Sequence, residues 1–170
     1  LPYHYQQRRY KIIHQALIIA NLPAPLHYLN FRSIISKSKI TLLRNQNSLR
    51  SRALDTATVL SSVSPHMQGH LNSYSIEQNC SLGQKHFQFA DREIISGDFP
   101  RFQIQRKDRE LSFDLAISTS TVISYFTKLR LGLADLWSLL CQCEGEFIYR
   151  GQNFPFRKIG CFYFDFSFIF

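Results

Sequence analysis

One aspartate and two histidines have the residue types and spacing that acid–base or metal chemistry needs. Asp114 lies beside Phe113 in an alternating run, and a carboxyl group held in an apolar pocket can act as a general acid. The alternative is an exposed strand carboxylate that pairs with a neighbouring arginine. His66 and His70 form an H-x-x-x-H pair. Pro65 precedes this pair and Gly69 lies within it, so we predict a loop over 64–70. We therefore predict a polar loop or cavity wall and no metal site.

The four cysteines do not form a redox or zinc motif. Cys141 and Cys143 are two apart in a predicted strand, so they share a face, but C-x-C is not the C-x-x-C spacing of such sites. We expect structural thiols in a reducing compartment, and hence a cytoplasmic protein. The sequence also lacks a phosphate-binding loop, a dinucleotide turn and a nucleophile elbow, so we predict no cofactor.

The positive charge of the chain is concentrated at its start. The net charge is +8, and residues 1–52 hold nine Lys or Arg and no Asp or Glu. Arg8, Arg9 and Lys11 lie in a segment, 3–21, whose apolar residues follow a helical repeat, so we predict a basic helix that ends before Pro23. Such a helix either packs on the rest of the fold or docks peripherally on an anionic membrane. Nucleic acid is not favoured as a partner because no RNA-binding signature is present.

Residues 85–120 give the firmest structural signal, a series of strands and turns. Leu111, Phe113, Leu115 and Ile117 alternate with polar or small residues, which places one set on each face of a strand. The segments 96–98 and 107–110 are polar turns, so an antiparallel meander is expected. Further strands are predicted in 29–43, 53–63 and 73–80.

The pattern after Ser120 fits two structures. Apolar residues between 122 and 140 follow a helical repeat, but Gly132 interrupts it and alternation begins near Trp137. We predict a strand from about Leu136, a hairpin turn over 149–154 and a returning strand over 158–166.

The successions KHFQFADREIISGDFPRFQIQRKDRELSFDLAIST and CQCEGEFIYRGQNFPFRKIGCFYF carry a family resemblance. They resemble the lipocalin-like hydroxyneurosporene synthase (carotenoid 1,2-hydratase) superfamily, and in particular an uncharacterised bacterial branch of it, over roughly residues 70–164. The resemblance implies a pair of lipocalin-like barrels and the binding or hydration of apolar, polyene-like molecules. None of the family's catalytic residues can be matched here. The start at Leu1 and the Phe-dense end, FYFDFSFIF, lead us to expect part of a longer protein, for which the resemblance implies two barrels. The end FYFDFSFIF departs from the charged strand that the family pattern would continue with.

These observations predict a mainly β fold, an antiparallel lipocalin-like barrel or curved sheet with an N-terminal helix. We divide the chain into the helix and its Pro-rich link, 1–25, and the barrel-like domain, 26–170. The expected function is binding of a hydrophobic small molecule, lipid- or terpenoid-like, with hydratase or isomerase chemistry at Asp114 in the full-length protein. The alternative is a non-enzymatic basic module that uses residues 1–52 to dock on an anionic membrane or nucleic acid. The candidate ligand-binding residues are His66, His70, Tyr74, His86 and Trp137.

Overall fold

The computed structural model of the protein describes residues 12–36, 56–128 and 134–167. Eleven strands and one short helix form in these ranges, and the strands belong to one antiparallel sheet. The elements are β1 Ile12–Ala20, β2 Tyr28–Ser36, β3 Thr56–Val63, β4 His66–Ser75, α1 Ile76–Asn79, β5 Cys80–Leu82, β6 His86–Phe89, β7 Glu93–Asp98, β8 Arg101–Arg106, β9 Leu111–Lys128, β10 Ala134–Tyr149 and β11 Gln152–Ser167.

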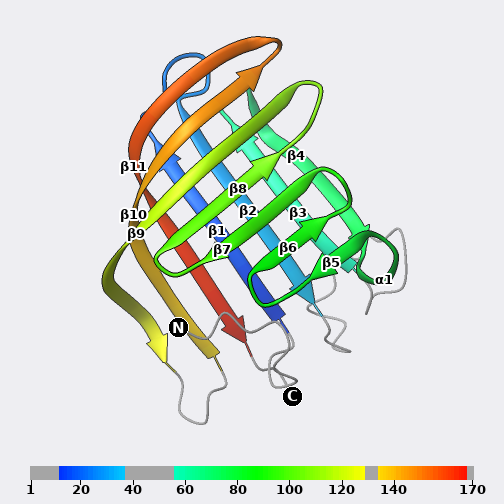
Figure 1. The fold of residues 1–170 in the computed structure, drawn as a ribbon, viewed down its shortest axis with the longest axis vertical. Coiled ribbons are helices and arrows are strands. Elements are labelled where there is room, and N and C mark those ends of the chain that lie inside the picture. Colours follow the sequence, from blue (N-terminus) through cyan, green and yellow to red (C-terminus); the bar gives the residue numbers. More distant parts are fainter. Residues whose placement is uncertain (1–11, 37–55, 129–133, 168–170) are drawn as a thin grey trace.

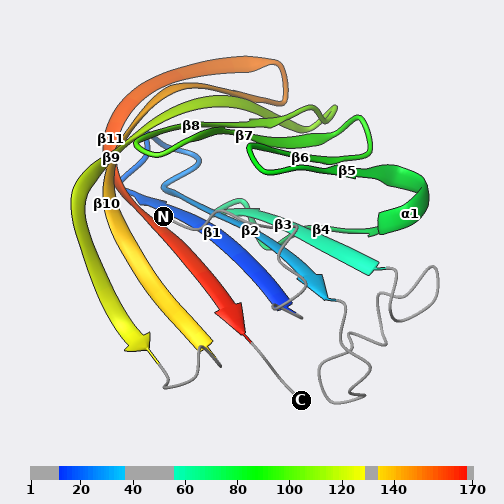
Figure 2. The same cartoon turned by 60° about the horizontal axis from the view of Figure 1, so that its bottom comes forward.

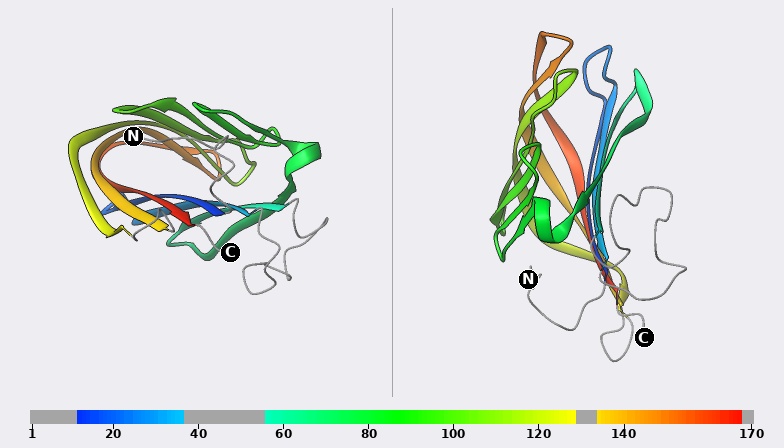
Figure 3. Two further views of the ribbon diagram at one scale, coloured as in Figure 1. Left: turned by 90° about the horizontal axis from the view of Figure 1, so that it is seen from below. Right: turned by 90° about the vertical axis from the view of Figure 1, so that its right-hand side faces the viewer.

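The sheet curls into a flattened, nearly closed barrel. The strand order is β4-β3-β2-β1-β11-β10-β9-β8-β7-β6-β5, so the first strand pairs with the last and both lie in the middle of the sheet. The long strands β9, β10 and β11 bend from one layer into the other (Figures 1 and 2). Seen from below, one layer holds β5 to β8 and the other holds β1 to β4, with α1 at the junction opposite the bend (Figure 3).

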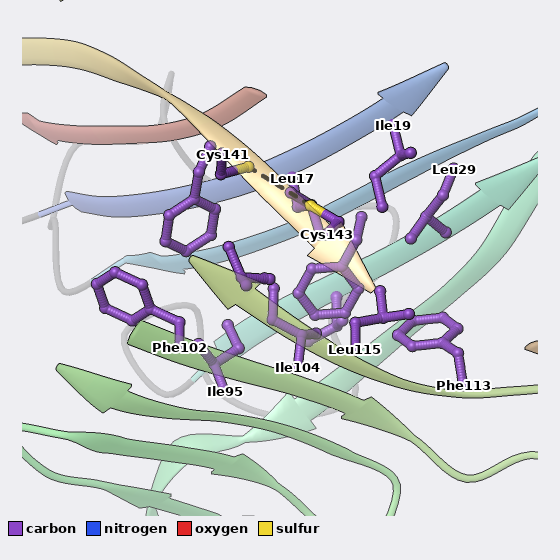
Figure 4. Packing of buried hydrophobic residues seen from close by; sticks show 14 of the residues in the cluster. Leu17, Ile19, Leu29, Ile95, Phe102, Ile104, Phe113, Leu115, Cys141 and Cys143 are labelled. Carbon is purple, nitrogen blue, oxygen red and sulfur yellow. Dashed lines mark hydrogen bonds between the residues drawn. The ribbon is translucent and has the colours of Figure 1, made fainter. Parts of the chain in front are cut away.

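Alternation along each strand explains which side chains fill the barrel. Leu111, Phe113, Leu115 and Ile117 are buried with exposed fractions of 3% or less, as the sequence predicts. Phe31 of β2 meets Phe113 of β9 edge to face, with ring centroids 6.0 Å apart. This contact joins the two layers directly. Figure 4 shows Leu17, Ile19 and Leu29 of one layer in the same buried cluster as Ile104, Phe113 and Leu115 of the other. Contacts of this kind make the interior a packed hydrophobic core.

The predicted N-terminal helix is wrong over its described part, because residues 12–20 form the central strand β1. Ile13, Gln15, Leu17 and Ile19 are buried, which is a period of two rather than of 3.6. Pairing with β2 and with β11, more than 140 residues later, supplies the backbone partners that a local pattern cannot reveal. The inward Gln15 is satisfied because its Oε1 accepts a 2.8 Å hydrogen bond from Ser33.

Two further local predictions are corrected and three are confirmed. The predicted loop over 64–70 is a tight turn at 64–65 followed by β4, which pairs with β3. In the predicted strand 73–80, residues 76–79 form α1, capped by the Ser75 hydroxyl, which accepts from the Gln78 amide. The meander of 85–120, strand character from Leu136 and the 149–154 hairpin are confirmed. Arg150 and Gly151 take positive φ in that hairpin.

Candidate functional site

The edges of the curled sheet meet at a seam that side chains close. Among the described strands, β4 pairs only with β3 and β5 pairs only with β6, so no ladder joins these two edge strands. The four residues of α1 connect them directly. We call this junction of β4, α1 and the β6–β7 turn the seam.

A buried ion pair lies behind the seam. Glu93 opens β7 and Arg106 ends β8, and the antiparallel register places them opposite each other on the inner face. Their exposed fractions are 0% and 1%. The Arg106 Nη1 donates to Glu93 Oε1 at 2.7 Å and to Ser61 Oγ at 3.3 Å, while its Nε donates to the Leu111 carbonyl at 3.2 Å. Each charge is thus compensated, as burial requires.

Two side chains of β4 complete the coordination of Glu93 from the opposite layer. Asn72 Nδ2 donates to Glu93 Oε1 at 3.1 Å, and the Tyr74 hydroxyl donates to Oε2 at 2.6 Å. Burial raises the pKa of Glu93 above its ordinary value, against the lowering effect of these donors and of Arg106. Burial and then the bond to Glu93 raise the pKa of Tyr74, so its hydroxyl stays protonated near neutral pH. These bonds connect the two layers across the seam.

A cleft of about 410 Å³ opens beside this buried cluster. Among the described residues, its wall comes from β4, α1 and the β6–β7 turn and carries amide and hydroxyl groups, one guanidinium and no carboxylate. The Tyr74 ring links the cleft to the core, because its centroid lies 6.3 Å from that of the buried Phe89. The lining residues are Asn72, Ser73, Tyr74, Ser75, Gln78, Asn79, Ala90 and Arg92.

Asp114, the predicted general acid, lies on the outer face of β9. Its two carboxylate oxygens accept from Gln103 Nε2 at 2.8 Å and Gln105 Nε2 at 2.7 Å, so the partners are amides of β8 rather than an arginine. The neighbouring Phe113 points into the core, as alternation requires. The structure does not bring Asp114 to the seam cleft, and its catalytic role stays a prediction.

The predicted ligand-binding residues are dispersed over the fold. Tyr74 lines the seam cleft, Trp137 of β10 is buried in the core with 4% exposure, and His86 is exposed on β6, where its ring contacts Gln88 at 3.3 Å. His66 and His70 belong to β4, and their side chains lie outside the described part of the structure. Only Tyr74 of this set is thus placed at the cleft.

The anionic-surface residues Arg8, Arg9 and Lys11 lie outside the described residues, so docking through the basic segment stays a prediction. Replacing all three with Gln should abolish such docking. In the unchanged chain, docking on an anionic surface should weaken steeply as the salt concentration rises. Within the described residues, no group of three potential metal ligands occurs. No helix in the same ranges has the length and apolarity needed to cross a bilayer.

Glu93 and Arg106 are the site residues that the sequence reasoning missed. Inward-facing positions of a strand are two residues apart. After Phe102 and Ile104 the next such position is Arg106, and the one before Ile95 is Glu93. Two opposite charges at inward positions of adjacent strands are a signal for a buried pair. The contribution of Asn72 had no such signal, because it depends on how the two layers face each other.

The architecture defines the class of this protein as a mainly β, lipocalin-type barrel, nearly closed and with a side-chain seam, to which the described residues contribute eleven antiparallel strands. By its sequence, the chain belongs to the family described as a family of unknown function, DUF6670, whose model matches residues 32–167. A search of curated proteins found no match.

A solved structure shows the same fold. It is that of a candidate AttH protein (NE1406) from Nitrosomonas europaea, which superposes with a TM-score of 0.66 at 11% sequence identity. The match covers 98% of this chain and 56% of that one, so the chain spans little more than half of the similar protein. At this identity the likeness establishes the fold alone. It agrees with the lipocalin-like barrel expected from the sequence.

Proposed function

We propose that this domain binds a hydrophobic small molecule, lipid- or terpenoid-like, that enters through the seam. The observation that carries the proposal is the closure of an otherwise hydrogen-bonded barrel by side chains between β4 and β7, directly beside a cleft of about 410 Å³. The volume of the cleft is in the range of small-molecule sites, and its described wall is mainly polar. The nearest apolar surface is the Tyr74 ring and, behind it, the fully buried Phe89, so the apolar body of the ligand has to pass Tyr74 while its polar end stays in the cleft.

The chemistry at the seam favours binding over a reaction. A hydratase or isomerase needs an acid that can pass its proton to the ligand. Both oxygens of Glu93 are occupied, by Arg106 and Asn72 on one side and by Tyr74 on the other. Asp114 is bonded to two glutamines on the outer face. Hydratase or isomerase chemistry in a longer protein therefore rests on the family resemblance and on no group of this seam.

Native mass spectrometry of the purified chain, with lipid extraction of the adduct, tests this proposal. We expect a stoichiometric apolar adduct in the wild-type chain. Gln78→Trp adds bulk to the cleft wall from α1 and should displace the adduct or weaken its binding at least tenfold, whereas Ser118→Trp, on the exposed face of β9, should leave it unchanged. An adduct retained at full occupancy in the Gln78→Trp variant contradicts entry through the seam.

A further inference from the structure

We propose that the seam cleft selects a ligand whose head group is neutral and rich in hydroxyls, such as the glycerol of a monoacylglycerol. This inference rests on the proposed function and adds the chemical class of the polar end. Its basis is the composition of the described cleft wall, to which two asparagines, one glutamine, two serines and one tyrosine contribute. Hydroxyl groups both donate and accept hydrogen bonds, and amide and hydroxyl side chains match them in both roles.

Two amides of the cleft are available for a ligand. Gln78 and Asn79 lie on α1 with exposed side chains, and neither side-chain amide has a hydrogen-bond partner among the described residues. The backbone of α1 is fixed by the Ser75 cap at one end and at the other by the Asn79 carbonyl, which accepts from the Ala90 amide at 2.7 Å. The two side chains therefore stand on a fixed backbone at the cleft wall. This preorganisation reduces the entropy cost of holding a ligand.

The hydroxyl of Tyr74 adds a third polar group with a defined role. Its proton is committed to Glu93 at 2.6 Å, and its raised pKa keeps that proton in place. A phenolic oxygen that donates can still accept, so it offers an acceptor to a ligand hydroxyl. The wall thus presents donors and acceptors together, which the hydroxyls of a polyol can pair with in both roles, whereas an ester only accepts and a bare hydrocarbon does neither.

Charges near the cleft already have partners inside the protein. Arg92 lies 3.6 Å from Asp108, Arg106 is paired with Glu93, and Glu93 has no exposed surface. A charged head group would have to compete with these ion pairs. A neutral head needs no such exchange, and this argues against a fatty-acid carboxylate as the preferred ligand.

Three ligands with one acyl chain test the head group: monodecanoylglycerol, methyl decanoate and decanoate, each titrated calorimetrically below its micelle concentration. We expect the glycerol ester to bind at least tenfold more tightly than the other two. Gln78→Leu and Asn79→Leu should each weaken the binding of the glycerol ester about 3- to 10-fold, which corresponds to the loss of one hydrogen bond. Each should leave the affinity for methyl decanoate unchanged. Gln84→Leu, an exposed amide away from the cleft lining, is the matched control.

The outcomes separate this inference from the proposed function. If all three ligands bind with equal affinity, the head group is not recognised, and the inference fails while the proposed function stands. If decanoate binds most tightly and Arg92→Gln abolishes that preference, the cleft is an anion site and the inference also fails. If none of the three binds to the wild-type chain, the proposed function fails as well.

Discussion

Removing Arg106 should destabilise the fold more than any single change on the surface of the same strand. Arg106→Met keeps the alkyl stem but leaves Glu93, with 0% exposure, as an uncompensated buried charge. It also removes the hydrogen bonds to Ser61 and to the Leu111 carbonyl. Breaking a buried pair by removing one partner costs about 3–5 kcal/mol. For a chain of this size this corresponds to a melting temperature lower by roughly 6–20 °C.

The measurement is urea and thermal unfolding followed by the fluorescence of Trp137, the one tryptophan of the sequence, which is buried in the core. Arg101→Met is the matched control, because Arg101 lies on β8 as well but is exposed, and it should change stability little. The double variant Glu93→Gln/Arg106→Met should regain part of the lost stability, because Glu93→Gln removes the buried carboxylate that Arg106→Met leaves without a partner charge.

The loss should also depend on pH with a defined sign. The pKa of Glu93 is raised in the folded state, so the folded state binds the proton more tightly than the unfolded state. The stabilisation that Glu93 contributes is fully present below its pKa in the unfolded state and is lost as the pH rises through its pKa in the folded state. Without Arg106 the pKa rises further, so the variant should be closer to wild type at pH 5 than at pH 8. If the unfolding midpoint of Arg106→Met equals that of the Arg101→Met control at every pH, this reasoning is wrong.

Three other substitutions test separate parts of the fold. Gly145→Ala should cost roughly 3 kcal/mol in chemical denaturation, because φ is +152° and the new Cβ meets the Asp114 carbonyl. Burial, and then the charge of Arg32, lower the pKa of His14, so wild-type stability should fall as the pH drops below 6.5, and His14→Gln should remove that dependence in unfolding curves from pH 5 to 7. Leu17→Ala empties a fully buried position and should cost about 2–5 kcal/mol by the same unfolding assay; a loss below 1 kcal/mol would contradict the packed interior.

The sequence predicts the fold where local patterns are strict. The alternation over 111–118 and Gly151 of the 149–154 hairpin determine strands and a turn through short-range sterics, and they are confirmed. Asn153 lies in β11, and Arg150 takes the other positive φ of the turn. The N-terminal helix failed for the opposite reason. Ile13 and Leu17 satisfy both a helical and a strand period, and the choice depends on β11, which lies at the other end of the chain. Non-local pairing overrides local propensity in such a segment.

The candidate site was only partly predictable for a related physical reason. Tyr74 was named as a ligand residue from its type, but its partner Glu93 lies 19 residues later on another layer. Asp114 is a candidate because it lies in a clearly predicted strand, but the alternation of that strand places its side chain on the outer face of the sheet. Inward charges at 93 and 106 were readable from the period, whereas the encounter of β4 with β7 follows from the curvature of the whole sheet.

The energetics of the seam favour it as the place where this otherwise continuous barrel opens. Each net hydrogen bond contributes about 0.5–1.5 kcal/mol, and somewhat more when one group is charged. The Asn72 and Tyr74 bonds to Glu93 together with the Arg106–Ser61 bond therefore amount to a few kcal/mol across the seam. A central strand such as β1 is bonded along its length on both sides, so separating it costs far more. Local opening in proteins selects the regions of lowest stability. In this barrel that argument selects the boundary between β4 and β7, next to the cleft, to the Gln78 and Asn79 amides that have no side-chain partner among the described residues, and to the Tyr74 ring that lies against Phe89.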